Sequence, residues 1–289
     1  MASSDNTPIT QVNAPWTLKG TVYSIPLYSS TATVSTLDTH KPFLYPPLEL
    51  ESNFSQGKLL GGAGAIQIIR YTESPVGPYD ELLLVPGAYT YEKEDGDGKI
   101  QKQRGPRITR IYVSQKYTCW NGRTHWNIPK HLACFTFTGH ADKGMTISVT
   151  PLDENTTAPY FSATFKPIPY LPSFPVTTGI AKYIGIDLDL VQPPLPEGKG
   201  AKGELPGTDL WCKITPYQAS SNTSLGWWDM KQGVTEEDAL LNSQARGEAS
   251  VEVEHENWWP GSRRWRIGMV MEAAVISFPE GQYWKGPNL

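Results

Sequence analysis

Lys130 is the residue of this sequence with the clearest potential for covalent chemistry. A lysine amine attacks a ketone only when it is uncharged, and an unperturbed lysine, with a pKa near 10.4, is almost wholly protonated at neutral pH. A site that uses such an amine must favour the neutral form, through desolvation or a neighbouring cation. The resulting imine draws electrons from the bond β to it, as decarboxylation, retro-aldol cleavage, aldol addition and dehydration require. The alternative is an ordinary solvated lysine.

Two apolar segments flank this lysine and must position it. Residues 110–113 and 133–138 are rich in β-branched and aromatic side chains, which predicts strands. Pro129 directly precedes Lys130 and restricts the backbone there. We therefore predict that residues 121–132 form a loop between two strands, with the lysine pointing into a sandwich or barrel interior.

Three motifs, in the same order and at similar spacing, resemble the acetoacetate decarboxylase family. Residues 122–132 are similar to its Gly-Arg-Glu…Pro-Lys-Lys-Leu signature, whose first lysine forms a Schiff base with a keto acid. Residues 45–49 (Tyr-Pro-Pro-Leu-Glu) resemble its Pro-x-Pro-Leu-Glu turn, and residues 77–81 (Gly-Pro-Tyr-Asp-Glu) its Gly-x-Tyr-x-Glu segment. The agreement covers about residues 20 to 140. The resemblance implies an antiparallel β cone or barrel with an internal apolar pocket, and it makes Lys130 the Schiff-base former.

Departures from the family's pattern imply a changed substrate or reaction. His131 stands where the family has a second lysine, so a fixed positive charge is missing, although imidazole can act as an acid or base near pH 7. Thr124 and Gln67 stand where the family has glutamates, and Thr21 lies near the place of the arginine that the family offers to the substrate carboxylate. The sequence therefore predicts weak or no turnover of acetoacetate and a bulkier, less anionic substrate.

Further candidate residues lie in or near these motifs. Glu81 is retained and could relay a proton to the substrate. Arg70 could replace the missing carboxylate binder, whereas Arg123 is better explained as a donor to backbone carbonyls than to an oxyanion. The predicted catalytic residues are Lys130, Glu81 and His131, and the predicted substrate-binding residues are Gln67, Arg70, Arg123, His125, Trp126 and Tyr79. The alternative for Glu81 is a solvated glutamate at the end of a strand. For His125 and Trp126 the alternatives are a loop histidine and a core tryptophan.

The composition favours an all-β chain of many short strands with few short helices. The 289 residues include 25 prolines and 26 glycines, and patterns of helical period are scarce. We expect a flexible N-terminal arm at residues 1–15, a single domain at residues 16–289, and a short helix at residues 235–241 after a capping signal. Further strands are predicted at residues 22–28, 65–71, 81–86, 145–149, 160–165, 210–214 and 264–276, an Asp-Gly turn at 95–98, and loops at 167–175 and 192–207.

Charge and cysteine usage narrow the classes of partner. The net charge of −4, without a basic cluster, argues against nucleic acid. The three cysteines have no metal-ligand spacing, so we predict free structural thiols, no metal and no cofactor. We expect a cytoplasmic protein without a membrane span, because no secretory signal and no run of ~18 apolar residues is present. The sequence allows a homo-oligomer.

These observations favour an enzyme that converts a bulky keto compound in natural-product (secondary) metabolism. Lys130 would form a Schiff base in a decarboxylase-like lyase, or it would act as a cationic hydrogen-bond donor in a cyclase or pericyclase that folds and polarises its substrate. A non-catalytic binder of an apolar small molecule would use the same pocket without the chemistry.

Overall fold

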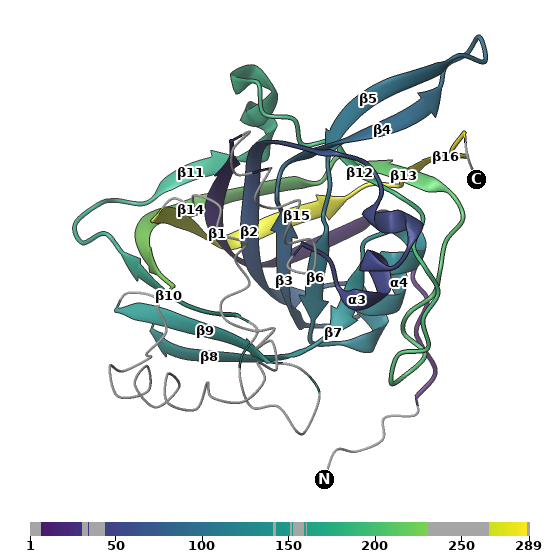
Figure 1. Ribbon diagram of the computed structural model, residues 1–289. Helices are drawn as coiled ribbons and strands as arrows, with labels where there is room; N and C mark the ends of the chain where they lie inside the picture. Colours follow the sequence, from purple (N-terminus) through teal and green to yellow (C-terminus); the bar gives the residue numbers. More distant parts are fainter. Residues whose placement is uncertain are drawn as a thin grey trace, which may run out of the picture.

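The computed structural model describes residues 7–30, 34, 44–140, 143–150, 152, 159, 161–230 and 266–287. In this part of the chain strands predominate and the helices are short, which confirms the predicted all-β class (Figure 1). The expected helix at residues 235–241 lies outside the described residues. No described helix has the length and apolarity needed to cross a membrane.

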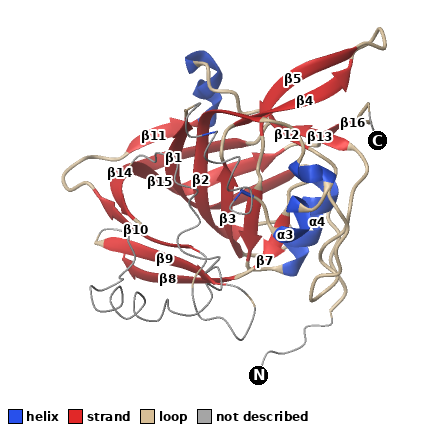
Figure 2. Ribbon diagram, in the orientation of Figure 1, coloured by secondary structure: helices blue, strands red, loops and turns tan. Residues whose placement is uncertain are grey.

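Most strands belong to one large sheet, which curls so that its ends approach each other (Figure 2). Its strands are β1 (Trp16–Ser29), β2 (Leu59–Glu73), β3 (Tyr79–Val85), β4 (Ala88–Glu94), β5 (Ile100–Pro106), β6 (Arg110–Val113), β7 (Lys130–Leu132), β8 (Cys134–His140), β9 (Gly144–Thr150), β10 (Phe161–Pro167), β11 (Phe174–Thr177), β14 (Tyr217–Asp229) and β15 (Ile267–Phe278). The order is β7-β6-β3-β2-β1-β15-β14-β10-β9-β8, with β4, β5 and β11 beside this path. Every predicted strand overlaps one of the observed strands.

A second sheet and four short helical elements complete the described structure. The small sheet joins β12 (Leu190–Gln192), β13 (Trp211–Ile214) and β16 (Gln282–Trp284). The helical elements are α3 (Pro47–Leu50), η1 (Asn53–Ser55), α4 (Lys116–Trp126) and η2 (Thr178–Ile184). Among the described strand pairs only β6 and β7 run parallel, because α4 connects them and returns the chain in the same direction.

The large sheet is buried on both of its faces around β3. On β3, Leu82 and Leu84 pack into one apolar core, and Leu83 packs into another with Ile69 and Ile111. A strand buried on both sides has no reason to alternate polar and apolar residues, which explains the continuous apolar run of β3. Each such side chain contributes roughly 1.5–3 kcal/mol on burial.

Prolines lie where the sheet needs no donor from them. Pro26 pairs with Ala65 of β2 beyond the point where β15 stops pairing with β1, so it occupies an edge position. The prediction of an unpaired loop at residues 167–175 was partly wrong, because β11 begins at Phe174 and pairs with β14. A shift of register at Pro175 accommodates the missing N–H on this edge strand.

The hairpin of β4 and β5 projects from the body of the molecule (Figure 1). Its tip is the predicted Asp-Gly turn. The backbone N–H of Asp95 donates to the carbonyl of Lys99 at 2.9 Å, and the Asp95 carboxylate accepts from the backbone N–H of Asp97 at 3.0 Å. These contacts confirm the turn.

Residues 121–132 do not form the predicted loop. Most of them belong to α4 and β7, with a left-handed Asn127 (φ 51°) ending the helix. The Gln115 side chain caps the other end by accepting from the Thr118 N–H at 3.2 Å. The helix escaped prediction because its buried face is largely polar and lacks an apolar stripe of helical period.

One use of that polar face is to hold the N-terminal segment. Asn121 accepts from the backbone N–H of Val12 and donates to the carbonyl of Thr10, each at 2.8 Å, and Lys116 donates to the carbonyl of Thr7 at 2.7 Å. The described part of the expected flexible arm is therefore bound along α4, through side chains that the sequence gave no reason to assign to it.

Candidate active site

The three motifs that resemble acetoacetate decarboxylase meet at β7. Glu49 ends its motif in α3, Glu81 ends its motif in β3, and the third motif runs from Gly122 in α4 to Leu132 in β7. The strand order β7-β6-β3 places Lys130 one strand away from Glu81. Segments that are separate in sequence thus form one cluster.

The side chain of Lys130 is buried among polar groups. Its Nζ lies 2.8 Å from Glu81 Oε2, 2.9 Å from Thr118 Oγ1 and 5.2 Å from the centroid of the Tyr79 ring. The lysine side chain is 5% exposed and that of Glu81 is 2% exposed. A buried ammonium needs an ion pair and further hydrogen bonds to offset its lost hydration, and Glu81 and Thr118 supply these.

Gly122 makes room for the lysine stem. A Cβ added at this position would lie 2.7 Å from both Cδ and Cε of Lys130. A larger residue would therefore force the lysine stem to shift from this position. Glycine within a helix costs about 1 kcal/mol relative to alanine, and the passage of the lysine stem explains why it is present here.

Two tyrosines close the cluster around Glu81. The Tyr71 hydroxyl donates to Glu81 Oε1 at 3.3 Å, and the Tyr71 and Tyr79 ring centroids are 4.4 Å apart. Burial, reinforced by the Glu81 charge, raises the pKa of both phenols well above its ordinary value. Both tyrosines are neutral at physiological pH and remain available as hydrogen-bond donors.

A second buried carboxylate lies on the other side of β7. Successive residues of a strand point to opposite faces, so His131 faces away from the Lys130 ammonium. Its Nε2 lies 2.7 Å from Glu49 Oε2, and Arg123 Nη1 lies 2.8 Å from Glu49 Oε1. Burial alone would raise the pKa of Glu49, but His131 and Arg123 together lower it. The structure therefore places His131, a predicted catalytic residue, beside Glu49 and away from the Lys130 amine.

Arg123 connects this second carboxylate to the backbone of the lysine. It is fully buried, and its Nη1 also lies 3.3 Å from the Lys130 carbonyl oxygen, to which the Cys119 thiol donates at 3.1 Å. Its Nε and Nη2 donate to the carbonyls of Pro206 and Pro196 at 3.1 and 2.8 Å. These contacts agree with the backbone-carbonyl role that we favoured for Arg123.

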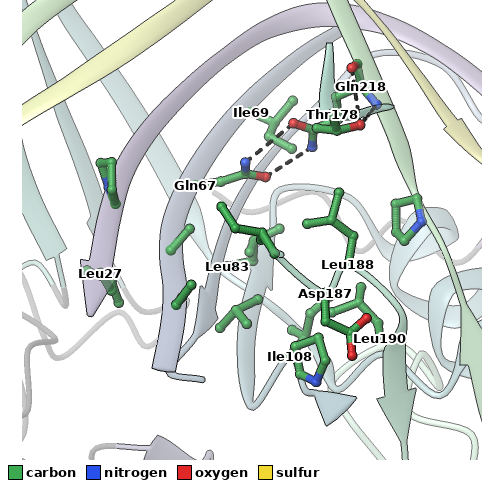
Figure 3. Close-up of a pocket in the computed structure, with 18 of the residues that line it drawn as sticks. Leu27, Gln67, Ile69, Leu83, Ile108, Thr178, Asp187, Leu188, Leu190 and Gln218 are labelled. Atoms are coloured by element: carbon green, nitrogen blue, oxygen red, sulfur yellow. Dashed lines mark hydrogen bonds between the residues drawn. The ribbon is translucent and has the colours of Figure 1, made fainter. Parts of the chain in front are cut away.

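An apolar cavity of about 270 Å³ lies beside the sheet (Figure 3). Its lining residue Leu83 pairs with Ile111, the partner of Lys130, so the cavity and Lys130 share one face of the sheet. Leu83, Leu188 and Leu190 form part of its wall, and the predicted binding residue Gln67 lies at one end. Among the described lining residues none is lysine, arginine or histidine. The cavity is thus suited to an apolar ligand.

The cavity ends next to Glu81. Ile69, which lines the cavity, is the cross-strand partner of Glu81, and Leu83 follows two residues along the same face of β3. Lys130 itself does not line the cavity. The cavity lining therefore includes neighbours of Glu81 but not the amine itself.

Arg70 does not lie at this cavity. It follows Ile69 on β2 and points to the opposite face, where its side chain is 56% exposed, pairs with Asp80 at 3.7 Å and lies 4.6 Å from the Phe137 ring centroid. The structure therefore does not place Arg70, the proposed replacement for the missing carboxylate binder, at the apolar cavity, because the alternation of the strand turns it to the other face.

His125 and Trp126, at the end of α4, also lie away from the cavity lining. Trp126 packs edge-on against Trp16, with ring centroids 5.2 Å apart, and its Nε1 donates to the Pro279 carbonyl at 2.8 Å. Burial lowers the pKa of His125, whose ring lies against Trp126. Trp126 thus matches the alternative of a core tryptophan, whereas His125 lies in α4 and not in the loop expected for it.

Several residues of the site were missed from sequence. Glu49 and Gly122 lie within quoted motifs, so the signal was present, but neither side chain was given a role. Thr118, Tyr71 and Gln218 gave no signal, because their places depend on the helical form of α4 and on strand register. No group of three His, Cys, Asp or Glu side chains suited to a metal occurs in the described part of the chain.

The architecture is that of the acetoacetate decarboxylase fold, as predicted. Acetoacetate decarboxylase from Legionella pneumophila matches with a TM-score of 0.55 over 99% of this chain and 94% of that one, at 13% identity. A second solved acetoacetate decarboxylase gives 0.53 over 96% and 92%, at 12% identity. An acetoacetate decarboxylase-like enzyme from Sphingomonas wittichii RW1 gives 0.53 over 94% and 93%, at 8% identity. Comparisons of the sequence with family models and with curated proteins found no match.

Proposed function

We propose that this protein is an enzyme acting on a bulky apolar carbonyl compound, with Lys130 as the reacting amine and Glu81 as its proton acceptor. The observation that carries the proposal is the buried Lys130–Glu81 ion pair, 2.8 Å long, beside an apolar cavity. A lysine and a carboxylate in contact form a nucleophile with its base already in place.

The proposed reaction begins with transfer of one proton from Lys130 Nζ to Glu81 Oε2. The neutral amine adds to the substrate carbonyl carbon and forms a carbinolamine. Protonated Glu81 then gives its proton to the departing hydroxyl group, and water leaves. The ammonium and the carbonyl compound have become a protonated imine and water, and Glu81 is again a carboxylate.

The protonated imine determines which bonds can react. It accepts electrons from a bond to the adjacent carbon, so the site serves decarboxylation, or cleavage and formation of a carbon–carbon bond. A free carboxylate bound in the cavity would lack a cationic partner among the described lining residues and would lose several kcal/mol of compensation. Acetoacetate is therefore a poor substrate in this proposal, and a bulky natural product in secondary metabolism is preferred.

A second candidate function keeps Lys130 as an ammonium throughout. The Glu81 carboxylate stabilises that charge, and His131 is bound to Glu49 and supplies no charge beside Nζ. The ammonium would then donate a hydrogen bond to negative charge that develops on an oxygen during a cyclisation. One such donor is typically worth a factor of about 10² to 10³ in rate.

Borohydride trapping tests the covalent proposal. The protein is incubated with a panel of apolar ketones and sodium borohydride, and the adduct is located by peptide mass spectrometry. We expect one reduced adduct, on Lys130, that disappears in Lys130→Arg. Lys116→Arg is the matched control, because Lys116 is also buried but donates to the Thr7 carbonyl.

The other possible results of this experiment distinguish the alternative functions from one another. Turnover of a ketone without any adduct would contradict the imine and favour the ammonium mechanism. A ligand that binds without turnover, with an affinity unchanged by Lys130→Met, would contradict both mechanisms and indicate a non-catalytic binder.

A further inference from the structure

Two glutamine side chains bind each other at one end of the apolar cavity. Gln67 Nε2 donates to Gln218 Oε1 at 3.4 Å, and Gln218 Nε2 donates to Gln67 Oε1 at 3.0 Å (Figure 3). The two residues belong to β2 and β14 and are 151 positions apart in sequence. Their amides form a closed pair within the lining of the cavity.

The pair is held in place before any ligand arrives. The backbone N–H of Gln218 donates to Thr178 Oγ1 at 2.9 Å, and that hydroxyl donates to the Gln218 carbonyl at 3.3 Å. Gln67 lies in the middle of β2, paired with Ser24 on one side and Leu83 on the other. A ligand therefore meets polar groups that are already ordered, which reduces the entropy cost of binding.

The hydrogen bonds within the pair leave half of its capacity unused. A primary amide has two N–H donors and two oxygen lone pairs. The pairing of Gln67 with Gln218 uses one donor and one lone pair of each side chain. One donor and one lone pair of each amide remain, and a neutral ligand group that carries a donor beside an acceptor complements them.

The charge of the cavity lining disfavours an anion beside the Gln67–Gln218 pair. Asp187 is the charged residue among the described lining residues, and its carboxylate lies toward the end of the cavity away from Gln67 (Figure 3). A carboxylate ligand would meet no cation there. It could accept from the spare N–H groups, but it has no donor for the spare lone pairs of the two amide oxygens. Electrostatics and hydrogen bonding therefore favour the same neutral class of ligand.

We infer that Gln67 and Gln218 form a recognition site for a neutral amide or lactam group of the substrate, and that this pair rejects carboxylates. The inference rests on the proposed function only in treating this cavity as the substrate site. Glu81, the cross-strand partner of Ile69, is displaced from Gln67 by two residues along the strand, roughly 7 Å, and by one strand across the sheet, roughly 5 Å, so the amide and the reacting carbonyl lie well apart. The substrate class is thus an apolar carbonyl compound with a remote amide.

Three probes with one skeleton test the recognition directly. 4-Phenylbutanamide, 4-phenylbutanoate and 5-phenylpentan-2-one differ only in the group attached to the carbonyl carbon. Their dissociation constants are measured calorimetrically with the full-length protein. We expect the amide to bind about tenfold more tightly than the ketone, which only accepts, and more than a hundredfold (~10²) more tightly than the carboxylate.

Variants assign this preference to the two amides. Gln67→Leu and Gln218→Leu should each lower the affinity for the amide to about that for the ketone. Gln67→Glu keeps the side-chain size and can still accept from Gln218 Nε2, but it lacks the spare donor and should also weaken amide binding. Leu188→Ala changes the apolar wall alone, so it should alter the affinities of all three probes without altering their ratio.

Lys130→Met separates this inference from the proposed function. The variant cannot form an imine, yet its preference for the amide over the carboxylate should equal that of the native protein. Equal affinities for amide and carboxylate would overturn the inference, as would a preference that survives in all three glutamine variants, or no binding of any probe up to its solubility. Failure of the borohydride experiment with the amide preference intact would overturn the proposed function alone.

Discussion

Two buried carboxylates on opposite sides of β7 have different surroundings. Glu49 is fully buried, and its two oxygens are bound by Arg123 at 2.8 Å and His131 at 2.7 Å. Glu81 is equally buried, but its partners are the Lys130 ammonium at 2.8 Å and the Tyr71 phenol at 3.3 Å. A guanidinium keeps its proton in proteins, whereas an ammonium can lose one.

Because of this difference, one cluster holds the backbone of Lys130 and the other binds its side-chain amine. The Glu49 cluster fixes the backbone of Lys130, because Arg123 and Cys119 both bind the Lys130 carbonyl oxygen. The Glu81 cluster binds the other end of the lysine, where protons can move between the amine and the carboxylate. A fixed charge thus supports the strand, and in the proposed mechanism the exchangeable proton lies at the side chain of Lys130.

The largest expected effect comes from replacing Lys130. If the residue forms an imine, Lys130→Met and Lys130→Arg should both abolish turnover, since a guanidinium does not lose its proton to attack a carbonyl. If it acts as a cation, Lys130→Met should lower kcat by about 10² to 10³, while Lys130→Arg retains part of the rate. Steady-state kinetics on a ketone that the native protein converts distinguish these results. Full activity in both variants would end the assignment of Lys130.

Replacing Glu49, the carboxylate that does not contact the Lys130 amine, should affect the stability of the protein more than its activity. Glu49→Gln leaves the buried Arg123 guanidinium without its anion, so we expect the free energy of unfolding to fall by about 3–5 kcal/mol. Urea denaturation measures this loss. The conservative Glu73→Gln, which removes an exposed partner of Lys19, is the control and should change stability by no more than about 1 kcal/mol. An unchanged midpoint in Glu49→Gln would show that the Glu49 cluster is not the anchor described here.

The same variant should alter the dependence of stability on pH. The pKa of Glu49 in the folded protein lies below its ordinary value of 4.5. Its contribution is therefore complete above pH 4.5 and is lost as pH falls through the folded pKa. The native protein should lose stability more steeply below pH 4.5 than Glu49→Gln, when both are followed by urea denaturation. Parallel curves would contradict the lowered pKa.

Next in size is the effect of filling the space beside the lysine stem. In Gly122→Ala the new methyl group would overlap Lys130 Cδ and Cε, so the ammonium must leave its place beside Glu81. A misplacement of about 1 Å can cost roughly 10²-fold in rate, and we expect kcat to fall by about that factor. Gly96→Ala is the matched control, since its Cβ would meet no atom within 4 Å. Native kcat in Gly122→Ala would show that the position of the lysine stem is not critical.

The sequence predicted those parts of the molecule that local patterns determine. The strands and the Asp95 turn follow from apolar runs and turn residues, and the motif resemblance named both Lys130 and Glu81 as candidate catalytic residues. Helix α4 could not be predicted, because its buried face carries Asn121 and Arg123 where a helical pattern calls for apolar residues. Such residues are buried only because distant segments supply their hydrogen-bond partners.

The remainder of the site depends on register between distant strands. Gln67 faces Gln218 because β2 and β14 line the same cavity, and no local pattern encodes that meeting across 151 positions. In the same way, His131 was predicted to be catalytic because it stands where the family has its second lysine. One step along a strand reverses the direction of a side chain, and β7 therefore gives the two residues different partners.

The smallest expected effect concerns Cys119, whose thiol we expect not to react with an alkylating reagent in the native protein. Its thiol donates to the Lys130 carbonyl, and burial raises its pKa, so no thiolate should form while the cluster around Arg123 stays closed. Burial also raises the pKa of Cys212, to about 12, whereas Cys134 is exposed and all three cysteines are free. At pH 8, iodoacetamide should therefore modify Cys134 alone in the native protein and all three in urea, and Cys134→Ser should abolish native labelling. Labelling of Cys119 in the native protein would show that the contacts holding the Lys130 backbone open in solution, and the distinction between a fixed anchor and a reactive pair would fail.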